Sequence, residues 1–347
     1  MVPADATPPL AGDGPASVVG IDPEPRLARA KAWGLRNGVV LALAAEMLFF
    51  WSQSPTFMTA DNIRLIFLQV SGVAIMAVPS ALLLLSGYID FAVGSTMGLS
   101  SIVLGKQLDA DTSAVAACAI AVCIAAAVGA CQGLAATKLR FAPIIVTLGF
   151  FTAVRGVTYV VGDGKLTSGW SDEFQQIGQG LLPGTRIPTP AVIAAVVFVL
   201  GGLFHVKTRW GRYIVALGVN AEAARRAGIN PYRLPFLLYV ASGVAAGIAA
   251  IILVSRLNSA PPTLGEGDEI KVLGAVLLGG VAFGGGRGNL LGVAAGVIFI
   301  GVLNNGLLQL GAKPFWVPVS SGAALVAAAA LDAGSKFLER RAKGGVP

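Results

Sequence analysis

The sequence predicts an all-α, polytopic integral membrane protein: a helical bundle of about ten transmembrane helices with one or more broken or re-entrant segments. Apolar side chains make up 55% of the 347 residues and charged ones only 12%, whereas soluble domains usually carry roughly 25% charged residues. Mean hydropathy is +0.76, and apolar runs follow one another along most of the chain. These values exclude a disordered chain and disfavour a soluble globular enzyme.

Candidate spans follow from the length of the apolar runs, since a helix needs about 20 apolar residues to cross roughly 30 Å of hydrocarbon. Ten segments come near this length, of which 37–53, 91–106 and 271–284 are short. The other seven are 63–86, 113–136, 142–161, 189–206, 236–255, 290–310 and 315–333. Only Gly87 to Asp90 separates 63–86 from 91–106. We therefore expect this pair to form a broken or re-entrant element, which is tolerated at membrane depth where protein or water covers it.

The distribution of positive charge predicts the orientation of the chain. With the N-terminus inside, the cytoplasmic segments hold 17 of the Lys and Arg residues and the outer segments hold 7. Because Lys and Arg are retained on the cytoplasmic side, this asymmetry favours an even number of crossings with both termini cytoplasmic. Residues 1–25 are expected to form a disordered cytoplasmic tail, 26–335 the transmembrane domain, and 336–347 a basic cytoplasmic tail.

The sequence lacks the motifs of an enzyme, a metalloprotein or a nucleotide-binding protein. His205 is the single histidine, and three cysteines share one apolar run at spacings that fit neither a metal site nor a disulfide framework. No GxxxxGK[ST] loop occurs, and the glycine run 279–289 does not have the GxGxxG spacing. We therefore expect no catalytic residue, metal or cofactor, and any ATP that the protein depends on must be hydrolysed by another chain.

Several polar residues lie within the predicted spans. A carboxylate at membrane depth costs about 2.5–3.5 kcal/mol, so Asp90 is expected to face protein or water. One interpretation places Gly87 and Asp90 at a helix break beside a translocation pathway, with Asp90 accepting hydrogen bonds from freed backbone N–H groups. The other makes Asp90 a helix cap at the inner membrane surface. Both interpretations stay open from the sequence.

Amides and hydroxyls provide the remaining pathway candidates. Asn304 and Asn305 lie in the middle of a span, where amides either bind a polar cargo or join helices by hydrogen bonds. Gln69 and Thr147 are further residues that a pathway could expose. The candidate pathway set is Gly87, Asp90, Thr147, Asn304 and Asn305.

The inner loop 207–235 carries six Lys and Arg residues against one acid, Glu222. Within it, residues 219–229 predict a short helix, with Asn220 as N-cap and Gly228 as C-cap glycine. A negative charge in the first turn, as at Glu222, suits the helix dipole. Three small residues are expected to form one face, namely Ala223, Ala224 and Ala227. The same composition also fits an ordinary cytoplasmic loop, since Lys and Arg are enriched on that side of a membrane protein.

Four segments together resemble a known family. The stretch SGYIDFAVGS (86–95) is similar to a G-x-I-D-L-S-V-G motif, although Phe91 and Ala92 replace the usual Leu and Ser. The other three are APIIVTLGFFTAVRGVTYVVGDG (142–164), TRWGRYIVALGVNAEAARRAGIN (208–230) and LGAVLLGGVAFGGGRGNLLGVAAGVIFIGVLNNGL (273–307). They resemble the permease subunits of bacterial sugar ABC importers, the ribose/xylose/galactoside group. The branched-chain amino-acid permeases are relatives with similar glycine-rich features.

This resemblance implies a permease subunit in the bacterial inner membrane that forms the pathway for a monosaccharide, pentose- or hexose-like, without bond chemistry. It also implies cytoplasmic ABC ATPase subunits, a periplasmic substrate-binding protein and a second permease subunit in a homodimer or heterodimer, with no nucleic acid. The ATPase contact would be the short inner helix, at Asn220, Glu222, Ala223, Ala224, Arg225, Ala227 and Gly228. The alternatives are a branched-chain amino-acid ABC permease and a stand-alone secondary transporter, and an integral membrane enzyme is disfavoured.

Overall fold

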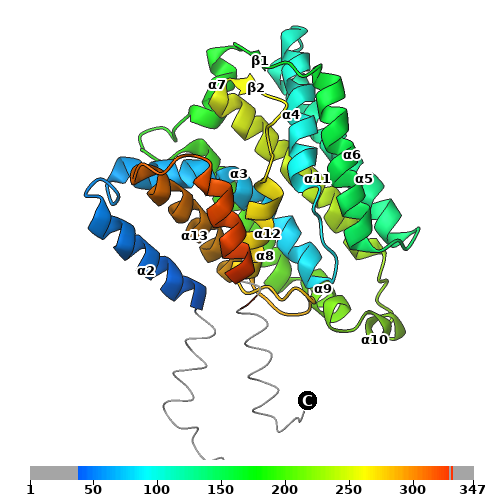
Figure 1. The fold of residues 1–347 in the computed structure, drawn as a ribbon. Helices are drawn as coiled ribbons and strands as arrows, with labels where there is room; N and C mark the ends of the chain where they lie inside the picture. Colours follow the sequence, from blue (N-terminus) through cyan, green and yellow to red (C-terminus); the bar gives the residue numbers. More distant parts are fainter. Residues whose placement is uncertain (1–37, 328–329, 331–347) are drawn as a thin grey trace, which may run out of the picture. The chain divides into compact units, whose positions relative to one another are not determined.

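The computed structural model describes residues 38–327 and residue 330. The expected tails 1–25 and 336–347, and both ends of the expected membrane domain 26–335, lie outside the described residues. Within the described part the chain is mostly helical (Figure 1), as the sequence predicts.

The elements follow one another as helices joined by short loops. They are α2 (Gly38–Gln53), α3 (Ala60–Leu85), α4 (Val93–Asp109), α5 (Ala114–Thr137), α6 (Pro143–Gly162), β1 (Thr167–Ser168), α7 (Asp172–Gln179), α8 (Thr189–Lys207), α9 (Arg209–Val219), α10 (Ala221–Arg226), α11 (Arg233–Leu257), β2 (Ser259–Ala260), α12 (Asp268–Leu278) and α13 (Leu290–Gln309). A further apolar helix covers Trp316–Ala327.

Six of these helices are long and apolar enough to cross a membrane: α3, α5, α6, α8, α11 and α13. Each of the ten predicted segments overlaps a helix in its described part, but within the described residues four of those helices fall short of the spanning length or hydropathy. They are α2, α4, α12 and the Trp316–Ala327 helix. The structure therefore supports a polytopic membrane protein, and the number of ten crossings stays a prediction.

One predicted segment has different bounds in the structure. The run 271–284 was expected to be helical throughout, but α12 begins earlier, at Asp268, and ends at Leu278. The next residues form a loop, in which Gly280 and Gly286 have φ angles of +82° and +75°. A side chain would disfavour this left-handed backbone, so the glycine run ends the helix.

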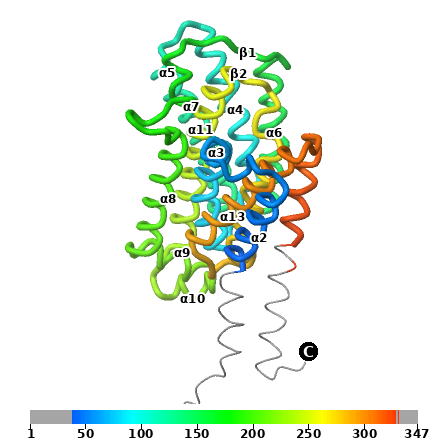
Figure 2. The backbone as a smooth tube through the Cα atoms, turned by 90° about the vertical axis from the view of Figure 1, so that its left-hand side faces the viewer, coloured from blue at the N-terminus to red at the C-terminus, as the bar shows by residue number. Residues whose placement is uncertain are grey.

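The helix α11 is central, because it packs against α3, α4 and α5 (Figure 2). Glycines allow the closest of these contacts. A Cβ atom at Gly243 would overlap the carbonyl oxygen of Ala125 on α5, and one at Gly129 would overlap the carbonyl oxygen of Tyr239. Membrane helices that approach backbone to backbone in this way gain dispersion and weak hydrogen-bond contacts.

Short elements in the connecting loops depart from a purely helical fold. The strands β1 and β2 pair antiparallel, with Thr167 opposite Ala260 and Ser168 opposite Ser259. Ser255 on α11 binds the backbone of α7. Its hydroxyl donates to the Phe174 carbonyl and accepts a hydrogen bond of 2.7 Å from the N–H of Gly178. The loop between α6 and α8 is therefore folded back onto α11.

Candidate coupling helix and translocation path

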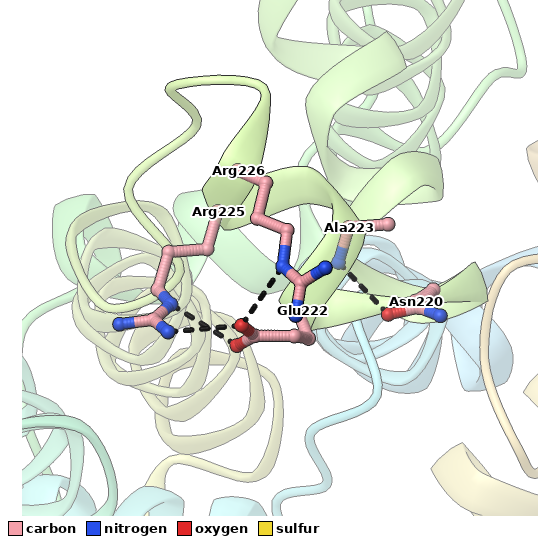
Figure 3. Close-up of polar contacts among 5 residues, drawn as sticks. All are labelled: Asn220, Glu222, Ala223, Arg225 and Arg226. Atoms are coloured by element: carbon pink, nitrogen blue, oxygen red, sulfur yellow. Dashed lines mark hydrogen bonds and ion pairs between the residues drawn. The ribbon is translucent and has the colours of Figure 1, made fainter.

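The short helix α10 lies at the same end of the helical bundle as α9 (Figure 1). Its N-terminus is capped as the sequence predicts, since Asn220 Oδ1 accepts a hydrogen bond of 2.9 Å from the backbone N–H of Ala223 (Figure 3). Glu222 accepts hydrogen bonds from Arg225 at 2.9 Å and Arg226 at 3.3 Å. These bonds, above all that from Arg225, hold the pKa of the Glu222 carboxyl below its usual value.

The C-terminus of α10 forms a Schellman motif. The N–H of Gly228 donates to the Arg225 carbonyl and that of Ile229 donates to the Ala224 carbonyl, each at 3.0 Å. Gly228 has φ +82°, which favours glycine at this position. Asn230 then forms the turn that leads into α11, because its side-chain oxygen accepts from the N–H groups of Tyr232 and of Arg233, the first residue of that helix. A helix of only six residues is thus fixed at both ends by local bonds.

The three alanines of the predicted small-residue face differ in exposure. Ala223, Ala224 and Ala227 were expected to form one face, and Ala224 is buried against the protein. Ala223 and Ala227 are exposed. Neighbouring positions on a helix point about 100° apart, and in this short helix Ala224 points inward. The exposed residues of α10 are therefore Ala221, Glu222, Ala223, Arg225 and Arg226, and Ala227 is exposed directly after the helix.

The end of α9 meets the end of α3 backbone to backbone. The N–H of Gly286 donates to the Leu85 carbonyl at 2.9 Å, and a Cβ atom at Gly218 would overlap that carbonyl oxygen. Gly87 lies next to this junction with φ +84°. Helix α9, which leads into α10, is therefore in direct contact with the point where α3 breaks.

The segment between α3 and α4 is held inside the bundle by Asp90. Its carboxylate accepts a hydrogen bond of 2.9 Å from the Ala92 N–H and one of 2.6 Å from the Ser242 hydroxyl. Tyr239 donates to the Ile89 carbonyl at 2.8 Å. Ser242 lies nine residues into α11, which is about 13 Å from the helix end. Asp90 therefore binds α11 away from its end, and the choice between a helix break beside a pathway and a cap at the membrane surface stays a prediction.

A cavity of about 280 Å³ lies among α3, α11, α12 and α13. Its apolar walls carry five polar side chains: Gln69, Arg256, Asp268, Lys271 and Asn304. Lys271 forms an ion pair of 2.7 Å with Asp268, and Arg256 donates to the Leu68 carbonyl at 3.1 Å. An apolar pocket with a few convergent polar groups is the usual form of a small-molecule site.

The candidate pathway residues occupy different places. Asn304 lines the cavity, whereas Asn305 is buried and accepts a hydrogen bond of 3.0 Å from Asn62, joining α13 to α3. Thr147 is buried and donates to the Pro143 carbonyl of its own helix. Gly87 and Asp90 lie at the break, away from the cavity lining. The cavity therefore contains one of the five residues chosen from the sequence, together with Gln69.

Arg256, Asp268 and Lys271 were missed as candidate site residues. Lys271 is the first residue of the predicted span 271–284, and Arg256 directly follows the span 236–255. A charge at the edge of an apolar run was therefore the only sequence signal for these two residues. Their convergence depends on the turn between α11 and α12, which also carries β2.

Two side chains of α6 hold this turn. Arg155 donates to the Leu264 carbonyl at 2.9 Å, and the Tyr159 hydroxyl donates to Glu266 at 2.5 Å. Arg155, a charge within a predicted span, thus binds backbone carbonyls of the segment that leads into α12.

Comparison with known proteins identifies the family. Residues 62–329 match the family model described as "Branched-chain amino acid transport system / permease component". The ribose import permease protein RbsC of Escherichia coli K12 is 35% identical over 304 residues, covering 87% of this chain and 95% of that protein. RbsC of Bacillus subtilis is 37% identical and covers 85% and 92%.

The D-allose transport system permease protein AlsC of Escherichia coli K12 is 32% identical, covering 86% of this chain and 91% of that protein. No solved structure matches the chain. The similarity extends over nearly the whole of these relatives and includes the apolar helices described above. The chain is therefore a membrane permease component of the family that includes the ribose and D-allose permeases.

Proposed function

We propose that this chain is the permease subunit of an ATP-driven importer whose cargo is a monosaccharide of the pentose or hexose type. The observation that carries the proposal is the similarity to the ribose permease of Escherichia coli K12 over 95% of that protein's length. The cavity supports it, because Gln69 and Asn304 offer planar amides to hydroxyl groups. Asp268 and Lys271 neutralise each other, while Arg256 adds one positive charge to the lining.

The proposed complex has two permease subunits, a homodimer or a heterodimer, with the pathway along the two-fold axis. Two cytoplasmic ABC ATPase subunits bind it, and a periplasmic substrate-binding protein delivers the cargo. The chain lies in the bacterial inner membrane, crosses it about ten times and has both termini in the cytoplasm. It holds no metal or cofactor and catalyses no bond chemistry.

In this proposal α10 is the coupling helix, with Asn220 and Gly228 fixing its ends. Glu222, Ala223, Arg225 and Ala227 contact the ATPase, while Ala224 anchors the helix to the permease. Closure of the ATPases on ATP moves α10 and α9, and the junction of Gly218, Leu85 and Gly286 passes this movement to the break at Gly87 and Asp90. Thr147 and Asn305 then support the helices around the path, and Asn304 faces it.

The family description also makes a branched-chain amino acid a second candidate cargo. The test is uptake of radiolabelled ribose and of radiolabelled leucine by proteoliposomes that contain the complete complex. We expect ribose uptake that requires ATP and persists when proton and sodium gradients are dissipated. Uptake of leucine alone would overturn the sugar assignment, and gradient-driven uptake by the isolated chain would overturn the importer assignment.

The coupling role needs its own test. Ala227→Trp enlarges the exposed face of α10 without touching the buried Ala224, so we expect the ATPase to dissociate from the purified complex. Lys165→Trp places the same side chain on an exposed residue of the loop between α6 and α7, on the opposite side of the proposed membrane. Equal loss of the ATPase in both variants would contradict the assignment of α10.

A further inference from the structure

A second hollow, outside the proposed path, lies on the surface of the bundle. This groove has a volume of about 660 Å³ and is bordered by α3, α8 and α11. Both α8 and α11 pack against α3, whose residues Ile75, Val78 and Leu82 are buried beneath the groove. The wall from α8 consists of Val197, Leu200, Gly201 and Phe204.

The wall from α11 is one helical face. Most of its apolar lining residues recur at intervals of three or four positions, with Val240 beside them: Leu234, Leu237, Leu238, Ala241, Val244, Ala245 and Ile248. From Leu234 to Ile248 the face extends about 21 Å along the helix. This is longer than half of the roughly 30 Å hydrocarbon core, so an acyl chain of one leaflet fits along it.

The mouth of the groove is cationic and aromatic. Arg233 and Trp210 line the end next to α9, and the guanidinium of Arg209 lies over the Trp210 ring, 5.1 Å from its centroid. Among the described residues no carboxylate forms an ion pair with Arg233 or Arg209. Trp side chains at span edges lie at the headgroup level of a bilayer. An apolar groove thus ends at the guanidinium group of Arg233, and a second guanidinium group, that of Arg209, lies on the Trp210 ring beside it.

The geometry points to a binding site for an anionic phospholipid of the leaflet that borders α9 and α10. One acyl chain lies between α8 and α11 over α3, and the headgroup phosphate is bound by Arg233 and Arg209. A zwitterionic lipid would fill the same groove but would gain less from the two guanidinium groups. Basic pockets between transmembrane helices recognise anionic headgroups in this way. The site does not depend on the identity of the cargo.

The experiment uses Trp210 as the probe. In a variant that keeps only Trp210, with Phe at Trp33, Trp51, Trp170 and Trp316, quenching by acyl-brominated phosphatidylglycerol is compared with quenching by brominated phosphatidylcholine. We expect at least about fivefold stronger relative binding of phosphatidylglycerol, since each of the two cationic side chains near the surface contributes about 1 kcal/mol. Equal binding of the two lipids would overturn the proposal.

Two matched pairs of variants locate the site. Arg233→Gln removes the guanidinium but keeps the backbone N–H that Asn230 caps, and we expect it to abolish most of the lipid preference. Arg212→Gln removes an exposed guanidinium of α9 that does not line the groove, and we expect no change. Equal losses would indicate general attraction to a basic surface and would contradict a specific site.

Ala241→Phe fills the groove from an exposed position, and Ala127→Phe places the same ring on an exposed position of α5. We expect lower maximal quenching only for Ala241→Phe. Unchanged quenching in Ala241→Phe would place the acyl chain elsewhere and overturn the proposal. Phosphatidylglycerol retained by the otherwise unmodified chain and by Arg233→Gln, measured by mass spectrometry after purification, gives a second readout that needs no tryptophan replacements. Equal retention would contradict the site.

Discussion

The hydroxyl of Ser242 donates a hydrogen bond of 2.6 Å to the carboxylate of Asp90, which joins the middle of α11 to the segment between α3 and α4. These residues are far apart in the sequence, and both are buried. Because Asp90 also accepts from the Ala92 N–H, one side chain fixes both the local turn that precedes α4 and its attachment to the central helix.

Ser242→Ala should therefore destabilise the protein by about 1.5–3 kcal/mol, the contribution of a hydrogen bond to a charged group. The measurement is the unfolding midpoint in detergent. Ser71→Ala is the matched control, since Ser71 is also fully buried but bonds only to the Leu68 carbonyl of its own helix. Asp90→Asn keeps an acceptor for Ser242 and should cost less than Asp90→Ala. If the two serine variants behave alike, the attachment to α11 has no separate energetic role.

Substitutions of the neighbouring residues Asn304 and Asn305 should have different effects on stability and on cargo uptake. Asn305→Leu leaves Asn62 without one of its two acceptors, so we expect a loss of about 1–3 kcal/mol in the free energy of unfolding. Asn304→Leu removes an amide from the cavity wall and should reduce cargo uptake while leaving the unfolding midpoint nearly unchanged. Reversal of this pattern would remove Asn304 from the path.

The order of α10 should depend on pH through Glu222. The pKa of this carboxyl is lowered in the folded chain by Arg225. A lowered pKa stabilises the fold above the ordinary glutamate pKa, and the stabilisation is lost as pH falls through the lower, folded-state value. Amide hydrogen exchange of residues 221–226, corrected for intrinsic rates, should thus be constant at neutral pH and faster only below the ordinary value. Glu222→Gln should abolish this dependence, whereas Glu173→Gln should preserve it.

The contact between α5 and α11 should not tolerate a methyl group. Gly243→Ala would force the two backbones apart, and overpacking of this kind costs about 1–3 kcal/mol. Gly202→Ala on α8 meets no atom within 4 Å and should be neutral or stabilising, since alanine is favoured over glycine in helices by about 0.5–1 kcal/mol. Thermal unfolding of the two variants in the same detergent provides the comparison, and equal midpoints would contradict the close packing.

The sequence predicts local features well. The apolar runs locate the helices, and the pattern from Asn220 to Gly228 locates both ends of α10, because caps depend on residues a few positions apart. The sequence does not reveal that the Ala224 side chain is buried, because a helix of six residues is too short to show a hydrophobic period that marks its buried face. The glycine run after Leu278 indicates a loop, but the apolar residues within it favour a longer helix.

The cavity is less predictable than the helices. Arg256, Asp268 and Lys271 meet only because the turn between α11 and α12 is bound by Arg155 and Tyr159 of α6, and such contacts leave no periodic signal. Asn304 and Asn305 are chemically identical, and the rotation of α13 alone decides which one faces the cavity and which one binds Asn62. Neither α7 nor the pairing of β1 with β2 is apparent from the loop composition.

The junction of Leu85, Gly218 and Gly286 has a mechanical consequence. Where long side chains separate two helices, a small displacement of one is absorbed by rotamer changes before the other responds. At this junction the main chains themselves are in contact, so no side chain lies between them that could change rotamer and absorb a displacement. A displacement of α9 at Gly218 therefore acts directly on the carboxyl end of α3 at Leu85 and on Gly286, which donates to the Leu85 carbonyl from the loop between α12 and α13.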